Sequence, residues 1–271
     1  MRLSIVAENS TTSPSLTPEY GLSMHLDLEG LSILVDTAQG IGLFSNAFKM
    51  GIDLRRLDMV ALSHGHFDHV GGFASLYSYC GSIPLWGHPK INSLHCRLEG
   101  EKKRFIGFHL NKDAVDFHPV QGCVEIAPQM WALEIPKERR NPDFVHTPPH
   151  LVQEISGGES ILDPFEDDIS FVVEGRRGLS VLLGCAHAGV VNVLEEVSHF
   201  FGTREFFSVT GGMHLSRLEG GALEKIVKIL AKKFVVRHWF PCHCTGFSAA
   251  SMLAVQGQNV NWGHVGTVVD I

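Results

Sequence analysis

Three histidines and one aspartate fall within six consecutive positions directly after an apolar run, in the stretch MVALSHGHFDHVGG over residues 59–72. His64 and His66 are two residues apart, so in an extended segment their imidazoles point to the same side and can bind one metal ion. Asp68 and His69 follow where the chain begins to turn, which lets them reach a second ion nearby. The pattern predicts a metal site, and the alternative is a surface histidine tract without a ligand.

The chemistry expected of such a site is hydrolysis. Two divalent ions that share a water molecule lower its pKa from about 15.7 towards neutrality, so that hydroxide forms at ordinary pH. Asp68 on the second ion would orient this nucleophile and carry a proton towards the leaving group. Gly65, Gly71 and Gly72 allow the backbone to pass close to the ions. We therefore expect attack on an ester, an amide or a phosphoester.

The elements that must position the motif can be predicted from the spacing of apolar residues. A helix over residues 42–52 ends at a glycine and is followed by a buried strand over 57–63, which ends at the motif. The other expected elements of the first part are a strand over 2–8, a hairpin of strands over 21–28 and 31–38, a helix over 71–81 and a strand over 83–88. The second part is predicted to contain a hairpin within 168–189, helices over 190–202, 220–234 and 246–257, and strands over 206–212 and 235–243.

Residues 89–165 are poorer in pattern and contain eight of the twelve prolines, including the stretch HTPPH over 146–150. We expect a loop-rich insertion with some strands there, which would form a wall or lid of the site. The chain has no fixed-period repeat, low-complexity tract or clear linker, so residues 1–271 are interpreted as one domain. Two strand-rich halves with helices outside predict a sandwich of sheets between helices.

Composition limits the partners. The chain has 271 residues, is 44% hydrophobic and carries a net charge of −7, which disfavours nucleic acid and favours a small-molecule substrate. No apolar stretch approaches the ~20 residues that span a bilayer, so no membrane insertion is expected. Six cysteines do not make a disulfide scaffold in a chain of this length, and the first residues lack a secretory signal. We expect reduced thiols in the cytoplasm, and the pattern carries no signal for the oligomeric state.

The stretch HGHFDH resembles the H-x-H-x-D-H signature of the metallo-β-lactamase superfamily. Within it, the chain resembles a branch related to an archaeal dihydropterin ribofuranosylaminobenzene-phosphate synthase and its uncharacterised bacterial relatives, through the stretches AENS, VDTAQG, SHGHFDHVGG, DDISFVV, GCAHAGVVN, GGMHL and PCHCTG. The resemblance implies an α/β (α+β) fold, a four-layer αββα sandwich of two mixed sheets flanked by helices. It also implies two divalent metal ions, with zinc expected and manganese or iron as alternatives.

The resemblance extends the ligand set to His187 and His243. His187 follows a strand where the superfamily usually has a Gly-Asp pair, and His243 matches the late histidine that completes the second metal's ligands. Cys185 stands where members often have a bridging aspartate. Its thiolate can bind zinc, and the alternative is a small buried hydrophobic residue.

Further candidates surround this set. His214 follows two glycines and is interpreted as a substrate-contacting or proton-donating group, with a hydrogen-bonded core histidine as the alternative. Glu8, Asn9 and Thr245 are candidates for substrate binding, although Glu8 and Asn9 could also form an exposed loop pair.

Two cysteines, Cys242 and Cys244, flank His243, but no second cysteine pair lies at finger-like spacing. A structural zinc finger is therefore not expected.

Three functions follow from these residues. The first is a metal-dependent hydrolase that acts on a small molecule, phosphorylated or not. The second, which the resemblance implies, is a transferase that joins a phosphoribosyl sugar to an aminobenzoate with loss of carbon dioxide and pyrophosphate. The third is a non-catalytic metal-binding or redox sensor.

Diiron flavoproteins of this fold tend to carry Glu where His66 stands, so the nitrogen ligand favours zinc-like hydrolytic chemistry. Serine-hydrolase, Walker and Rossmann motifs are absent from the sequence.

Overall fold

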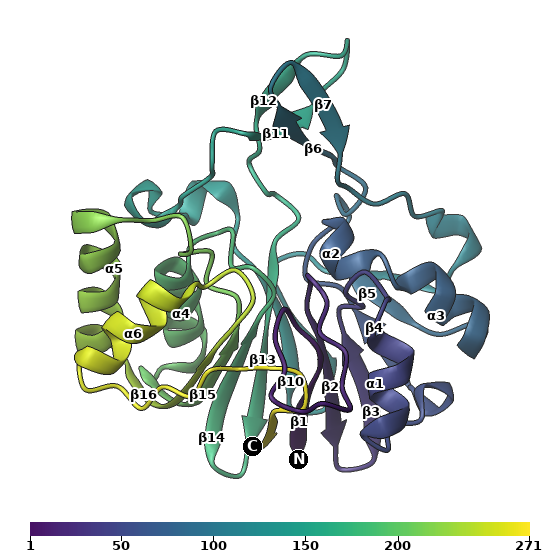
Figure 1. The fold of residues 1–271 in the computed structure, drawn as a ribbon, viewed down its shortest axis with the longest axis horizontal. Coiled ribbons are helices and arrows are strands. Elements are labelled where there is room, and N and C mark those ends of the chain that lie inside the picture. The colour runs from purple at the N-terminus through teal and green to yellow at the C-terminus, as the bar shows by residue number, and fades with distance from the viewer.

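The computed structural model describes residues 1–271 and consists of two mixed β-sheets packed face to face, with helices on both outer faces (Figure 1). This arrangement confirms the predicted αββα sandwich. No helix combines the length and the apolar character that a membrane span requires.

The first sheet has seven strands in the order β17-β1-β2-β3-β4-β5-β8. Its strands are β1 (Arg2–Ala7), β2 (Ser23–Leu28), β3 (Leu31–Val35), β4 (Met59–Ala61), β5 (Leu85–Gly87), β8 (Phe117–Pro119) and β17 (Val268–Asp270). Strands β3, β4, β5 and β8 run parallel, whereas β17 pairs antiparallel with β1 and brings the two chain ends together. The helices on this side are α1 (Leu43–Lys49), α2 (Phe67–Val70) and α3 (Phe73–Cys80).

The second sheet has six strands in the order β16-β15-β14-β13-β10-β9. Its strands are β9 (Cys123–Ala127), β10 (Met130–Glu134), β13 (Ile169–Gly175), β14 (Gly178–Leu183), β15 (Glu205–Gly211) and β16 (Val235–Pro241). Strands β14, β15 and β16 are parallel, as their helical connections require. The helices on this side are α4 (Val190–Phe201), α5 (Gly220–Lys233) and α6 (Phe247–Val255).

A third sheet of four strands, here called the cap sheet, lies above the opening between the two main sheets (Figure 1). Its strands are β6 (Leu94–Glu99), β7 (Lys102–Phe105), β11 (Leu151–Glu154) and β12 (Ser160–Leu162). Four short 3-10 helices complete the chain: η1 (Leu54–Arg56), η2 (Lys112–Ala114), η3 (Lys137–Arg139) and η4 (Pro142–Phe144).

The segment 89–165 contains more strand than its sequence pattern indicates. Besides all four strands of the cap sheet, it supplies β8 to the first main sheet and β9 and β10 to the second. Prolines stand at the ends of these short strands or in the turns between them, which obscures the alternation that would have revealed the strands.

Apolar residues on both faces of the second sheet hold the layers together. On β13, Phe171 and Val173 point between the two sheets, whereas Val172 points to the cluster under α4, α5 and α6. A strand that is buried on both faces is largely apolar, which explains the run ISFVV, in which Ser170 is the one polar residue. These packed layers fix the strand ends from which the candidate site is built.

Candidate metal centre

The predicted ligands come from loops that follow three strands of the two main sheets. The motif HGHFDH follows β4, Cys185 and His187 follow β14, and His243 follows β16. The loops meet closely, because a Cβ atom added at Gly184 would lie 2.1 Å from the Ser63 hydroxyl oxygen. Glycine at this position therefore lets the end of β14 approach the end of β4.

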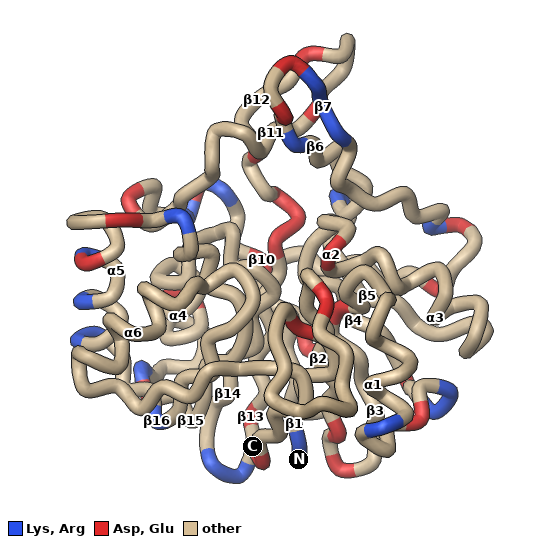
Figure 2. The backbone as a smooth tube through the Cα atoms, in the orientation of Figure 1, with Lys and Arg blue, Asp and Glu red and all other residues tan.

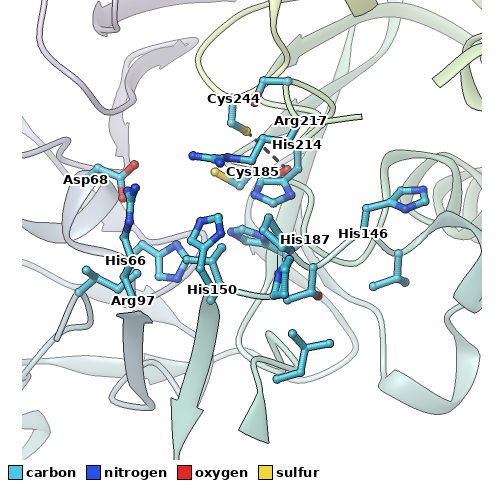
Figure 3. Close-up of a pocket in the computed structure, with 18 of the residues that line it drawn as sticks. His66, Asp68, Arg97, His146, His150, Cys185, His187, His214, Arg217 and Cys244 are labelled. Atoms are coloured by element: carbon cyan, nitrogen blue, oxygen red, sulfur yellow. Dashed lines mark hydrogen bonds between the residues drawn. The ribbon is translucent and has the colours of Figure 1, made fainter. Parts of the chain in front are cut away.

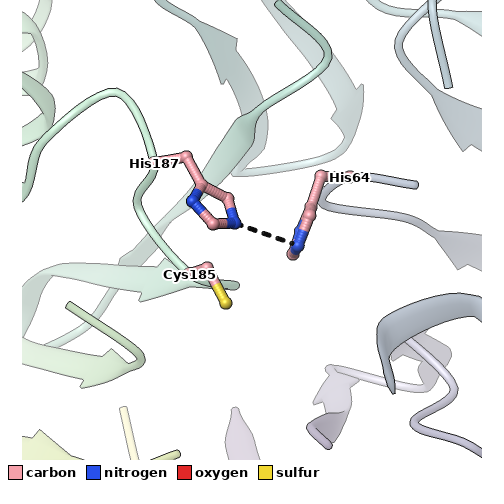
Figure 4. Close-up of side chains that lie close together, drawn as sticks. All are labelled: His64, Cys185 and His187. Atoms are coloured by element: carbon pink, nitrogen blue, oxygen red, sulfur yellow. Dashed lines mark hydrogen bonds between the residues drawn. The ribbon is translucent and has the colours of Figure 1, made fainter. Parts of the chain in front are cut away.

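A first cluster contains His64, Cys185 and His187, whose candidate ligand atoms all lie within 4.8 Å of one another (Figure 4). The Nε2 atoms of His64 and His187 are 3.3 Å apart. His66 lies beside them, its ring centroid 4.7 Å from that of His64, and its Nε2 is buried without a hydrogen-bond partner. A buried polar atom without a partner suits a ligand to a bound ion.

The protonation state of the histidines in this cluster favours the binding of a cation. Burial and the neighbouring His69 lower the pKa of His64 well below its usual value, and burial and His214 do the same for the pKa of His187. Neutral imidazoles carry a free lone pair, which is the form that binds metal ions.

A second cluster contains His69, Cys185 and His243, again with candidate ligand atoms within 4.8 Å of one another. The Nε2 atoms of His69 and His243 are 3.2 Å apart. The Oδ2 atom of Asp68 lies 3.4 Å from Nε2 of His243 and 3.9 Å from Nε2 of His69. Burial alone would raise the pKa of Asp68, but the hydrogen bond to His243 and the charge of His69 outweigh it and lower that pKa. Asp68 is thus a carboxylate that faces two imidazoles.

Cys185 belongs to both clusters, with its Sγ atom 3.3 Å from Nε2 of His69. Burial raises the pKa of this thiol well above its usual value, and the nearby Cys244 adds to the effect. A metal ion reverses this preference, because a coordinating thiol loses its proton. The sulfur therefore lies where one ligand could contact two ions.

Asp36 supports both clusters and was not among the predicted site residues. Its carboxylate accepts hydrogen bonds of 2.7 Å from Nδ1 of His69 and from the amide and hydroxyl of Ser63. Because the Ser63 hydroxyl donates to Asp36, it accepts from Nδ1 of His64 at 2.9 Å. Both histidines are thereby held with the Nε2 lone pair towards the centre, as hydrogen-bonded metal ligands usually are. Asp36 lies in the stretch VDTAQG after β3, and a carboxylate at the end of a buried strand was the available signal.

A second unpredicted group joins the cap sheet to the motif. His95 on β6 makes hydrogen bonds of 2.6 Å to Asp163 and 3.1 Å to Asp167. Asp167 also accepts the amide of Gly65 within the motif, at 2.7 Å. Burial lowers the pKa of His95, but the two carboxylates outweigh it and raise that pKa to about 10. His66, His95 and Asp163 also bring ligand atoms within 4.8 Å, yet both His95 nitrogens bind carboxylates, which leaves no lone pair for an ion.

The structure does not support direct substrate binding by Glu8, Asn9 or Thr245, because none of the three lines the cavity. Glu8 accepts the backbone amide of His243 at 2.7 Å, and Asn9 lies 3.0 Å from Nδ1 of the same residue. The Thr245 hydroxyl accepts the amide of Met213 at 3.0 Å and donates to a backbone carbonyl. All three are occupied in fixing the loop that carries His243. The loop-pair alternative for Glu8 also fails, because Glu8 is fully buried.

A cavity of about 1080 Å³ lies between the two clusters and the cap sheet, and Figure 3 shows residues that line it. His66, Asp68, Cys185 and His187 reach its floor. His214 also lines it, with its ring centroid 4.4 Å from that of His187. His214 adopts a left-handed backbone conformation with φ of 53°, which few residues other than glycine adopt.

Cys242 and Cys244 flank His243 but belong to neither ligand cluster. Cys242 is buried among the side chains between the two sheets, and the thiol of Cys244 donates to the Cys185 carbonyl at 3.8 Å.

The chain belongs to the metallo-β-lactamase superfamily, whose family model matches residues 16–200. It is 28% identical to the 7,8-dihydropterin-6-methyl-4-(β-D-ribofuranosyl)-aminobenzene-5'-phosphate synthase of Methanocaldococcus jannaschii, over 86% of this chain and 83% of that protein. It is 25% identical to the uncharacterized protein MJ0448 of the same organism, over 99% of this chain. The solved structure of Tm1679, a metal-dependent hydrolase of the β-lactamase superfamily, matches with a TM-score of 0.84 and 28% identity over 100% of this chain and 99% of that one. The family and branch expected from the motifs are thus confirmed.

Proposed function

We propose that the protein is a metal-dependent hydrolase with two divalent cations, zinc in the first instance, and that it acts on a small ester or phosphoester. His64, His66 and His187 would hold one ion, and Asp68, His69 and His243 the other. Cys185 would bridge them. The observation that carries the proposal is the meeting of two ligand clusters at one sulfur atom on the floor of a cavity.

The bound cations would supply an activated water, because divalent ions lower the pKa of water towards neutrality. Asp68 would orient this water through its free oxygen and accept its proton. His214, which lines the same cavity beside His187, is the candidate to protonate the leaving group.

Tyr20 also lines the cavity. Burial and the Asp68 charge raise its pKa to about 12, which keeps the phenol protonated as a hydrogen-bond donor to a substrate oxygen.

A transferase of the dihydropterin ribofuranosylaminobenzene-phosphate synthase type is the second candidate, because that relative is 28% identical over most of both chains. The two reactions are distinguished by incubating metal-loaded protein with phosphoribosyl pyrophosphate and p-hydroxybenzoate or p-aminobenzoate, beside bis(p-nitrophenyl) phosphate and p-nitrophenyl esters. Release of p-nitrophenol alone supports the hydrolase. Formation of a joined product supports the transferase, and neither reaction with any metal favours the third candidate, a metal-binding or redox sensor.

The variant that tests the centre is His187→Ala, with His199→Ala as its control because His199 is exposed on α4. Loss of an outer hydrogen-bond partner costs about tenfold to hundredfold in metal affinity or activity, so loss of a ligand should cost more than about a hundredfold. Metal content by mass spectrometry and p-nitrophenol release should fall together in His187→Ala and stay normal in the control. Full activity in His187→Ala, or in chelator-treated wild type, would refute the proposal.

A further inference from the structure

The cap sheet places two arginines directly opposite each other above the candidate metal centre. Arg97 on β6 and Arg104 on β7 are cross-strand partners, and both line the cavity. Like charges at directly opposite positions destabilise a sheet. The nearest compensation is the exposed carboxylate of Glu99, at 3.9 Å from Arg97 and 3.8 Å from Arg104, which is a weak ion pair in water. The two like charges therefore destabilise the free protein. An anion bound between the two guanidinium groups would remove this destabilisation.

A third arginine reaches the same cavity from the second main sheet. Arg217 follows β15 and lines the cavity, and Figure 3 shows Arg97 and Arg217 entering it from different sides. His150 lies among these groups, and its pKa is lowered by burial and then by the charges of Arg217 and Arg97. Three cations from three separate elements therefore converge on one space.

The cavity is positively charged, although the chain carries a net charge of −7. Asp68 is the only acidic residue that lines it, and Asp68 already faces His243 and His69. Figure 2 shows Lys and Arg segments on β6 and β7 and acidic segments elsewhere in the cap sheet, and of these charged residues Arg97 and Arg104 line the cavity. Because low-dielectric walls focus such a field, the cavity should concentrate small anions from solution.

The number of guanidinium groups indicates the kind of anion. One planar guanidinium fork satisfies a carboxylate, whereas three forks match the terminal oxygens and double charge of a phosphoryl group. Arg104 also lies over the ring of Phe67, at 5.8 Å, and Phe67 is part of the motif between His66 and Asp68. The arginines thus stand close to the candidate metal centre without belonging to it.

The rest of the cavity indicates what the phosphoryl group is attached to. Its wall contains Ile106, Pro148, Pro149 and Leu151, which offer apolar contact but no charge. Its volume of about 1080 Å³ is at the upper end of the roughly 300–1,000 Å³ usual for small-molecule sites, and far exceeds what a phosphate ion needs. An organic phosphate with an apolar or ring-shaped substituent would place its phosphoryl group among the arginines and its substituent against the apolar wall.

We propose that Arg97, Arg104 and Arg217 form a subsite for the phosphoryl group of an organic phosphate, whose reacting bond lies at the metal centre. The position of the reacting bond rests on the proposed hydrolase function. The anion subsite itself is built from residues outside both ligand clusters, so the two proposals can fail separately.

The test is isothermal titration calorimetry with phenylphosphonate, an aromatic phosphoryl compound without a hydrolysable ester bond. The protein is first dialysed against a chelator, so that the probe cannot bind a metal ion. Wild type is compared with Arg97→Gln/Arg104→Gln, with Arg217→Gln and with the control Arg176→Gln, whose residue is exposed in the turn between β13 and β14. Removal of charge-assisted hydrogen bonds should weaken binding by about tenfold or more in the first two variants. The control should bind as wild type does, and benzoate should bind more weakly than phenylphosphonate.

Phenylphosphonate binding of equal strength in all variants, or no binding to wild type, overturns the subsite. Equal affinity for benzoate and phenylphosphonate overturns the assignment to a phosphoryl group. Circular dichroism verifies that each variant is folded. Metal content, measured in parallel on metal-loaded samples, separates the two proposals. Wild type that binds metal but no phenylphosphonate refutes the subsite alone, and wild type that binds phenylphosphonate but no metal refutes the proposed centre alone.

Discussion

At the scale of single residues, the site contains candidate metal ligands and residues that orient these ligands through hydrogen bonds. Sequence motifs predict the ligands but not the residues that orient them. The run from His64 to His69 could be predicted because its chemistry is local. His187 and His243 required the resemblance to a family, since an isolated histidine carries no signal of its own. Asp36 could not be assigned, because its role is a hydrogen bond to His69 across 33 positions of the chain.

Replacement of Asp36 by asparagine tests this supporting role. The amide keeps the size of the side chain but cannot accept all three hydrogen bonds from Ser63 and His69. We expect zinc affinity to fall by about tenfold to hundredfold, the usual cost of losing an outer partner of a metal ligand. A competition titration with a chromophoric chelator measures this. Asp27→Asn, at an exposed position of β2, is the matched control, and unchanged zinc affinity in Asp36→Asn would contradict the role.

At the scale of elements, the unexpected feature is the cap sheet and its attachment. Most main-sheet strands outside residues 89–165 could be predicted because they are apolar on one or both faces, whereas the cap strands β7 and β12 are exposed along their length and give no such pattern. The cap is attached by His95, which makes hydrogen bonds to both Asp163 and Asp167. The same Asp167 binds the amide of Gly65, so one buried network links the cap to the motif.

Asp163→Asn tests this attachment. It leaves the buried, protonated His95 with one carboxylate, and removal of one partner of a buried ion pair costs about 3–5 kcal/mol. We expect the free energy of unfolding in urea to fall by an amount of this order. Glu154→Gln serves as control, because Glu154 pairs with Lys103 at a partly exposed position of the cap, where an ion pair contributes about 1 kcal/mol or less. Equal stability of both variants would show that the His95 network does not attach the cap.

At the scale of the whole molecule, the candidate centre joins the two main sheets. His64 and His69 follow β4 in the first sheet, whereas His187 and His243 follow β14 and β16 in the second. The sandwich could be predicted from the order of strands and helices together with the family motifs. The sequence does not predict which strand ends meet, or at what distance. These depend on how the two packed sheets are rotated against each other.

The central claim is that two cations lie between the sheets, one in each ligand cluster. Anomalous X-ray diffraction at the zinc absorption edge, recorded from crystals of the zinc-loaded protein, tests it most directly. We expect two peaks, the first among His64, His66 and His187, and the second among Asp68, His69 and His243, with the sulfur of Cys185 between them. A map with no peak at these positions, or with a single peak elsewhere in the molecule, would contradict the account.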